Sequence, residues 1–253
     1  MRMTSYGWAL KMGNIKHRKG RQDAKRGKIF SRLIRELTVA SKLGGPAPED
    51  NPRLRTALDK ALSANMPKDT IERAIKRGSG SAEGADLEET TYEGYGPGGV
   101  AVIVESMTDN NNRTVAEVRH AFTKSGGNLG TDGSVSYLFI KKGLIQISKN
   151  SDYEQLMEIA IEAGAEDIEE NLDNSLTIST LPEDFELVKQ ALIEEEVEII
   201  ESEISLIPET SVSTDLETSL KIYKLLESLE DLDDTQNVHS NADFPEEIIE
   251  HIN

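Results

Sequence analysis

The 253-residue sequence contains no cysteine. This excludes a disulfide framework, a thiolate nucleophile and cysteine metal ligands, and it fits a reducing compartment. The first residues hold no apolar core of signal-peptide length, and no stretch reaches the ~18 uninterrupted apolar residues of a membrane span. We therefore expect a soluble protein of the cytoplasm.

Signatures of common catalytic and metal sites are also missing. There is no GxSxG motif and no Walker A loop, and the histidines His17, His120, His239 and His251 form no HxxxH or HExxH pair. The many Asp and Glu residues could hide a catalytic carboxylate pair, which keeps an enzyme as a third class of function. The sequence predicts no catalytic residues, no metal site and no cofactor.

Two segments match ligand-binding patterns only in part. Residues 94–99 fit G-x-G-x-x-G, but a strand-like segment follows where a dinucleotide site needs a helix, so we interpret them as a turn. Residues 109–114 begin like a calcium loop, yet Arg113 occupies the third ligand position. We expect that segment to cap a helix.

Acidic residues are scarce in the N-terminal third, although the chain carries a net charge of −18. Residues 1–80 contain 19 Lys and Arg against 7 Asp and Glu, a net of +12, which leaves 9 against 39, or −30, for the rest. Between residues 14 and 42 only Asp23 and Glu36 are acidic. Because charges are screened over roughly 10 Å at 0.1 M salt, a partner of this third would meet mainly positive charge.

The basic residues gather in one run and on two helix faces. Along a predicted first helix, Lys25, Lys28, Arg32 and Arg35 are spaced 3, 4 and 3, opposite an apolar stripe that starts at Phe30. An ordinary solvated helix face is the alternative, but it would normally carry counter-charges. Few aromatic residues accompany the cations, so phosphate contact is favoured over base stacking. The predicted nucleic-acid-binding residues are Lys16, His17, Arg18, Lys19, Arg21, Lys25, Arg26, Lys28, Arg32, Arg35, Arg73, Lys76 and Arg77.

Residues 21–77 are predicted to form three helices. Apolar residues recur at helical spacing from Phe30 to Ala40, and glycines follow at 44 and 45. Asn51-Pro52 supplies an N-cap and a first-turn proline for the second helix, and Pro67 opens a third that ends at Gly78. The small, polar residues 78–85 lie where the charge changes sign, which indicates a domain boundary.

The rest of the chain alternates strands and helices. Strand-like TTYEGY, VAVIVESM and SVSYLFI surround the helix RTVAEVRHAFTKS. From LIQIS to VEIIESEISL the order is βαββαβ, which is typical of a ferredoxin-like fold. After Ile207-Pro208 a further βαβ is expected, ending in TQNVHSN.

These elements predict an α+β multidomain protein. Residues 1–80 form a basic helical domain, 81–141 and 207–244 a discontinuous α/β domain, 142–206 an inserted ferredoxin-like βαββαβ domain, and 245–253 a C-terminal tail. The acidic two-thirds is interpreted first as a solubilising surface. The alternative is that it contacts a basic protein or the chain's own basic domain and so lowers indiscriminate nucleic-acid binding.

Five blocks in this order resemble the YebC family: NIKHRKGRQDAKRGKIFSRLIRELTVASKLGG, DNPRLRTALDKALSANMPKDTIERAIKRG, YEGYGPGGVAVIVE, NNRTVAEVRHAFTKSGGNLGTDGSVSYLF and LEDLDDTQNVHSNADF. The resemblance covers residues 14–244. At the start it departs, because SYGWALKMG stands where the family usually has Gly-His-Ser-Lys-Trp-Ala. Any role of that tip is not carried over.

The resemblance implies three domains around a cleft, with a ferredoxin-like domain inserted in another α/β domain. It also implies a non-enzymatic regulator of gene expression. Members are described as DNA-binding transcriptional regulators, while others, including a mitochondrial translational activator, resemble ribosome-associated translation factors. We therefore expect nucleic acid as the partner, either DNA or rRNA within the ribosome, and no membrane; the oligomeric state is not specified.

Overall fold

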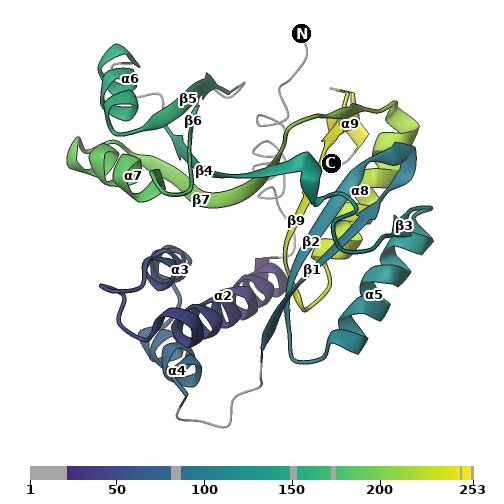
Figure 1. The fold of residues 1–253 in the computed structure, drawn as a ribbon, viewed down its shortest axis with the longest axis horizontal. Helices are drawn as coiled ribbons and strands as arrows, with labels where there is room; N and C mark the ends of the chain where they lie inside the picture. Colours follow the sequence, from purple (N-terminus) through teal and green to yellow (C-terminus); the bar gives the residue numbers. More distant parts are fainter. Residues whose placement is uncertain (1–21, 81–86, 149–152, 172–174, 246, 252–253) are drawn as a thin grey trace. The chain divides into compact units, whose positions relative to one another are not determined.

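The computed structural model describes residues 22–80, 87–148, 153–171, 175–245 and 247–251. The chain divides into two compact units, one that includes Tyr137–Ser211 and one that includes the flanking segments up to Ser136 and from Val212 onward (Figure 1). Each unit has its own core. The predicted division into three domains stays a prediction.

Three helices form the N-terminal part of the larger unit, which we call the helical module (Gln22–Gly78). They are α2 (Gln22–Gly44), α3 (Pro52–Ser63) and α4 (Lys68–Gly78). Their bounds agree with the predicted helices to within about two residues, as is usual for helix ends. The apolar stripe of α2 faces the module core, which contains Leu37, Ala40, Leu54, Ala57, Ala61, Met66, Ile71 and Ala74.

Two residues fix the packing of these helices. The Asn51 side chain accepts a hydrogen bond from the Leu54 amide as N-cap of α3 and donates to the Ala40 and Gly45 carbonyls at the end of α2. Gly78 lies where α4 crosses α2, and a Cβ atom there would collide with the Thr38 carbonyl oxygen. The close crossing therefore requires glycine at this position.

An antiparallel sheet of order β3-β1-β2-β9 follows in the same unit. Strands β1 (Glu88–Tyr95) and β2 (Ala101–Thr108) pair from Glu88–Thr108 to Tyr95–Ala101, so residues 96–100 are the hairpin connection. Of the turn expected at residues 94–99, Gly94 and Tyr95 belong to β1 instead. Short β3 (Asn128–Leu129) and β9 (Thr235–Ser240) complete the two edges.

Helices α5 (Asn111–Lys124) and α8 (Leu216–Glu230) pack on this sheet. Phe122 of α5 lies beneath Gly94, where a Cβ atom would clash with its ring. Asn110 caps α5 by accepting from the Arg113 amide, which confirms the capping role expected for residues 109–114. A two-stranded parallel sheet, β8 (Val212–Ser213) with β10 (Ala242–Asp243), and helix α9 (Ile248–His251) follow.

The Tyr137–Ser211 unit has the order β4 (Phe139–Ile147), α6 (Tyr153–Glu162), β5 (Ala165–Glu170), β6 (Leu176–Thr180), α7 (Phe185–Glu194) and β7 (Ile199–Pro208). Its sheet order, β5-β6-β4-β7, with antiparallel neighbours throughout, is that of a ferredoxin-like βαββαβ fold. Helices α6 and α7 share one core with the sheet, through residues such as Leu156, Ile178 and Leu192.

One predicted strand is wrong in its first five residues. The sequence predicts SVSYLFI as a separate strand, but Ser136–Leu138 form a 3₁₀ turn, and Phe139 begins β4, which continues through the predicted strand LIQIS. The Glu93 carboxylate accepts hydrogen bonds from the amides of Gly133, Val135 and Ser136. These amides are turned toward a side chain rather than toward a neighbouring strand, which accounts for the loss of strand structure.

Candidate nucleic-acid interface

The structure describes six of the thirteen predicted nucleic-acid-binding side chains. The other seven, Lys16, His17, Arg18, Lys19, Arg21, Lys25 and Arg26, lie outside the described side chains. The six that are described fall into two groups of three, one on α2 and one on α4. These groups have different surroundings.

The cations of α2 contact a short acidic segment between α8 and β9, here called the acidic loop (Glu230–Asp234). Lys28 donates to the Asp231 carboxylate at 2.7 Å and to its main-chain carbonyl at 2.8 Å. Arg32 donates to the Glu230 carbonyl at 2.5 Å. Arg35 donates to the Asp233 carbonyl and pairs with Asp234 at 3.0 Å. The face opposite the apolar stripe is thus occupied from within the chain.

Asp234 is the buried end of this contact, with its side chain 2 % exposed. One carboxylate oxygen accepts from Arg35, and the other accepts from Arg113, Thr114 and Thr108 at 2.7, 2.8 and 3.1 Å. Burial disfavours the ionised carboxylate, but these hydrogen bonds more than compensate and hold the pKa of Asp234 below its ordinary value. Asp234 therefore joins α2 to β2 and α5 as an anion.

A second ion-pair group joins the helical module to the sheet. Arg53 at the start of α3 donates to both Glu36 carboxylate oxygens at 2.7 and 3.0 Å, and to Glu89 of β1. The hydrogen bonds to Glu36, followed by those to Glu89, raise the pKa of Arg53 against the effect of its partial burial. Glu36, one of the two acidic residues in the cationic run, is therefore used internally.

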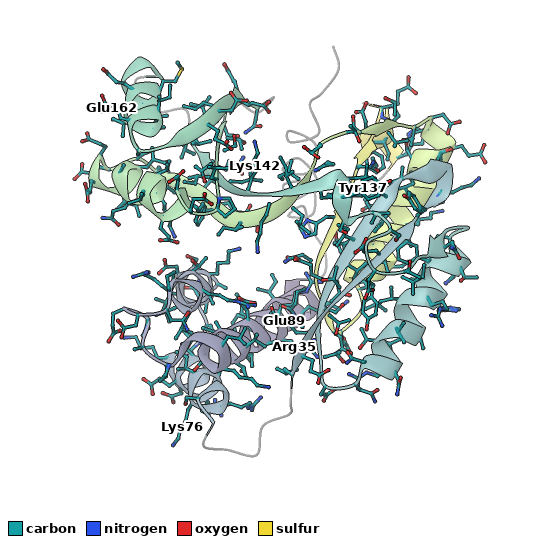
Figure 2. All side chains as sticks on the ribbon, viewed as in Figure 1. Arg35, Lys76, Glu89, Tyr137, Lys142 and Glu162 are labelled. Atoms are coloured by element: carbon teal, nitrogen blue, oxygen red, sulfur yellow. The ribbon has the colours of Figure 1, made fainter. Side chains whose placement is uncertain are left out.

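The cations of α4 have a different environment. Arg73, Lys76 and Arg77 are exposed, and Figure 2 shows Lys76 on the outer side of α4. Arg73 donates within its own helix, to the Asp69 carbonyl and the Thr70 hydroxyl. Among the residues that the structure describes, none forms a salt bridge with these three side chains. We call them the α4 basic face.

A pocket of about 370 Å³ lies between α2 and the acidic loop. Its α2 side consists of Gly27, Lys28, Ser31, Arg32 and Arg35, and its other side of Leu232 and Asp233. The lining is mostly polar, which is unusual for a small-molecule site and suits an anionic ligand. Sequence reasoning found the cations but not the pocket, which depends on a loop about 200 residues away.

The contact between α2 and the acidic loop has one signal in the sequence. LEDLDD follows an amphipathic helix with four acidic residues in six, and the basic run lacks counter-charges of its own. That combination indicates that acidic and basic segments could meet. It does not indicate which of the 39 acidic residues beyond residue 80 would do so.

A basic helical module joined to an antiparallel sheet, with a ferredoxin-like unit in the same chain, defines the class of this α+β protein. Comparison with known families agrees. Residues 10–81 match the TACO1/YebC protein N-terminal domain, and residues 87–242 match the TACO1/YebC second and third domain. The chain belongs to the TACO1/YebC family.

Curated relatives are similar over nearly their whole length. A "Probable transcriptional regulatory protein" of Coxiella burnetii is 58 % identical over 239 residues, which cover 94 % of this chain and 98 % of the relative. One of Nitrosococcus oceani is 60 % identical over 239 residues, covering 94 % and 96 %. Both names describe a regulator and specify no ligand.

A solved structure shows the same fold. The crystal structure of a conserved hypothetical protein, Aq1575 from Aquifex aeolicus, superposes with a TM-score of 0.83 at 54 % identity, over 92 % of this chain and 97 % of that chain.

Proposed function

We propose that this protein is a non-enzymatic regulator of gene expression that binds nucleic acid through its helical module. Its relatives are named probable transcriptional regulatory proteins, which supports a regulatory role. The observation that carries the binding proposal is the α4 basic face, three exposed cations without carboxylate partners in the described part of the chain. Cations held on one helix face are suited to contact successive phosphates.

The structure favours α4 over α2 as the primary contact surface. Lys28 and Arg35 already have carboxylate partners, so part of their charge is neutralised within the chain. Arg73, Lys76 and Arg77 keep their full positive charge, and each phosphate that they neutralise would release counterions. Aromatic side chains are few in the helical module, which favours recognition of phosphates and shape over base stacking.

Reversal of the α4 charges tests this proposal. In Arg73→Glu/Lys76→Glu/Arg77→Glu we expect affinity for a labelled DNA duplex or RNA hairpin to fall by more than about tenfold. The salt slope should flatten by ~0.9 for each duplex phosphate that the variant no longer neutralises. Fluorescence anisotropy over a salt series measures both, and circular dichroism checks the fold.

A matched control carries the same change in charge elsewhere in the unit. Arg119→Glu/Lys124→Glu/Lys224→Glu alters three exposed cations on α5 and α8. An equal fall in affinity in both triple variants would mean that only net charge matters, and the proposal would be wrong. The two polymers serve as separate arms, since a transcriptional regulator should favour the duplex and a ribosome-associated translation factor the RNA.

A further inference from the structure

We propose that the pocket between α2 and the acidic loop is a phosphate-binding site. In this proposal, one phosphodiester of a bound nucleic acid enters the pocket, replaces Asp231 as the partner of Lys28 and binds Arg32, whose present partner is the Glu230 carbonyl. The inference rests on the proposed function, because it names a second contact for the same ligand. It adds a site with a defined position and names Asp231 as the internal group that competes with the phosphate.

The pocket exists because two small residues lie between three cations on α2. Gly27 and Ser31 are one helical turn apart, beside Lys28, Arg32 and Arg35. A Cβ atom at Gly27 would meet nothing within 4 Å, so the space above the helix is open. The Ser31 hydroxyl and the three cationic side chains offer hydrogen-bond donors into this space. Donors on one wall and an open volume are what a phosphate group requires.

Arg32 is the central cation of the site and the one with a neutral partner. Its hydrogen bond goes to the Glu230 carbonyl, whereas Lys28 and Arg35 bind carboxylates. Burial lowers the pKa of Arg32, and the nearby charge of Asp231 acts in the opposite direction. A half-buried guanidinium with a neutral partner is stabilised by a bound anion, and the planar guanidinium of Arg32 can donate to two phosphate oxygens.

The carboxylates at the two ends of the acidic loop differ in how readily a phosphate can displace them. The Lys28–Asp231 pair lies at the rim, where the side chains are 39 % and 66 % exposed, so water and salt screen it. Asp234 is buried and held by four donors. A phosphate can therefore displace Asp231 while Asp234 keeps the loop attached to the unit.

Filling the pocket without changing its charge tests the site. In Ser31→Leu the new side chain occupies the pocket, and we expect affinity for the labelled duplex or hairpin to fall by roughly tenfold, as when a charge-assisted hydrogen bond is removed. The salt slope should flatten by about 1, because the variant binds one phosphate fewer. Gly27→Leu fills the pocket from one turn away and should give the same result. Ser228→Leu, an exposed position on α8, is the matched control.

Removing the competitor should have the opposite effect. Asp231→Asn weakens the internal partner of Lys28, and we expect affinity to rise roughly two- to fivefold, in line with removal of one exposed ion pair. Asp132→Asn, an exposed acid in the same unit, corrects for net charge. The increase should disappear when Asp231→Asn is combined with Ser31→Leu, because the pocket is then filled.

The outcomes separate this inference from the proposed function. If both pocket-filling variants bind as Ser228→Leu does, the pocket is not a phosphate site, while the α4 proposal stands. If Asp231→Asn binds as Asp132→Asn does, Asp231 is no competitor and the exchange is wrong. If reversal of the α4 basic face leaves binding intact but filling the pocket abolishes it, the proposed α4 contact fails and the pocket stands.

Discussion

Asp234 joins three elements of the fold, yet its sequence context does not distinguish it from the neighbouring aspartates. In the run LEDLDD, Asp231, Asp233 and Asp234 are chemically alike. The structure exposes Asp231 and Asp233 and buries Asp234 against Arg35 and Arg113. Composition could predict that acids and bases would meet. Only the tertiary fold selects the acid that becomes buried.

Asp234→Asn should destabilise the protein strongly. The substitution removes the anion and leaves Arg35 without its carboxylate partner, and breaking a buried pair from one side costs about 3 kcal/mol. Urea unfolding at neutral pH measures the change in the free energy of unfolding. Asp132→Asn, at an exposed site, should change it by no more than about 0.5 kcal/mol.

The same residue predicts part of the acid sensitivity. Because the folded pKa of Asp234 lies below its unfolded value of roughly 3.9, its contribution is complete above that value and is lost as the pH falls through the folded pKa. The difference in unfolding free energy between the wild type and Asp234→Asn should therefore be largest near neutral pH and shrink below about pH 4. A difference that stays constant to pH 2 would show that the ionised form of Asp234 is not what stabilises the fold.

At the scale of elements, local patterns predicted the helices well. The stripe from Phe30 to Ala40 and the Asn51-Pro52 start are signals within a few residues, and both helices form as expected. Leu54, Leu58 and Leu62 recur at intervals of four, which predicts an apolar stripe on α3. Leu62 is nevertheless 48 % exposed, and Ala57 and Ala61 face the core instead. Close helix packing selects small residues, which hydrophobic periodicity alone underweights.

Two glycines in the helical module should respond oppositely to substitution by alanine. Gly78→Ala should destabilise by about 1–3 kcal/mol, because the new methyl group would force α4 away from the Thr38 carbonyl. Gly27→Ala has open space and should stabilise α2 by about 0.5–1 kcal/mol through helix propensity alone. Thermal and urea unfolding of the two variants measure these changes. A stabilised Gly78→Ala protein would contradict the close crossing of α2 and α4.

The incorrect strand prediction for residues 134–138 has a physical cause. The residues from Ser134 to Leu138 have a strand-like composition, but Glu93 from a distant strand binds the amides at 133, 135 and 136. Glu93 is buried, and burial opposes its ionisation, yet these amide hydrogen bonds keep its pKa below the ordinary value. A long-range side chain thus overrides a local propensity.

At the scale of the whole molecule, the chain enters and leaves the Tyr137–Ser211 unit at neighbouring points. Strands β4 and β7 pair along their length, and the Glu209 amide donates to the Leu138 carbonyl at 2.9 Å just outside Phe139 and Pro208. The entry and exit points are therefore neighbours.

Among the described helices, none is long and apolar enough to cross a membrane.

Excision of the inserted unit should leave the remainder folded. We expect a variant with residues 139–208 replaced by a short Asn-Gly turn to keep cooperative unfolding and nucleic-acid binding, because the ends to be joined are already hydrogen-bonded. Circular dichroism during thermal unfolding and the anisotropy titration measure these properties. Absence of the cooperative transition would show that the larger unit depends on the smaller one.

The acidic loop also affects which polyanions can bind. Asp231 is tethered beside Lys28, and a short tether gives an effective local concentration on the order of millimolar. A free nucleotide or inorganic phosphate would compete with this tethered carboxylate at its own concentration and affinity. A polymer anchored at the α4 basic face would bring its own phosphates at a comparable effective concentration and compete on equal terms. Because an exposed ion pair is weak, the internal aspartate would disfavour free phosphates only a few-fold, while the anchored strand would still fill the site.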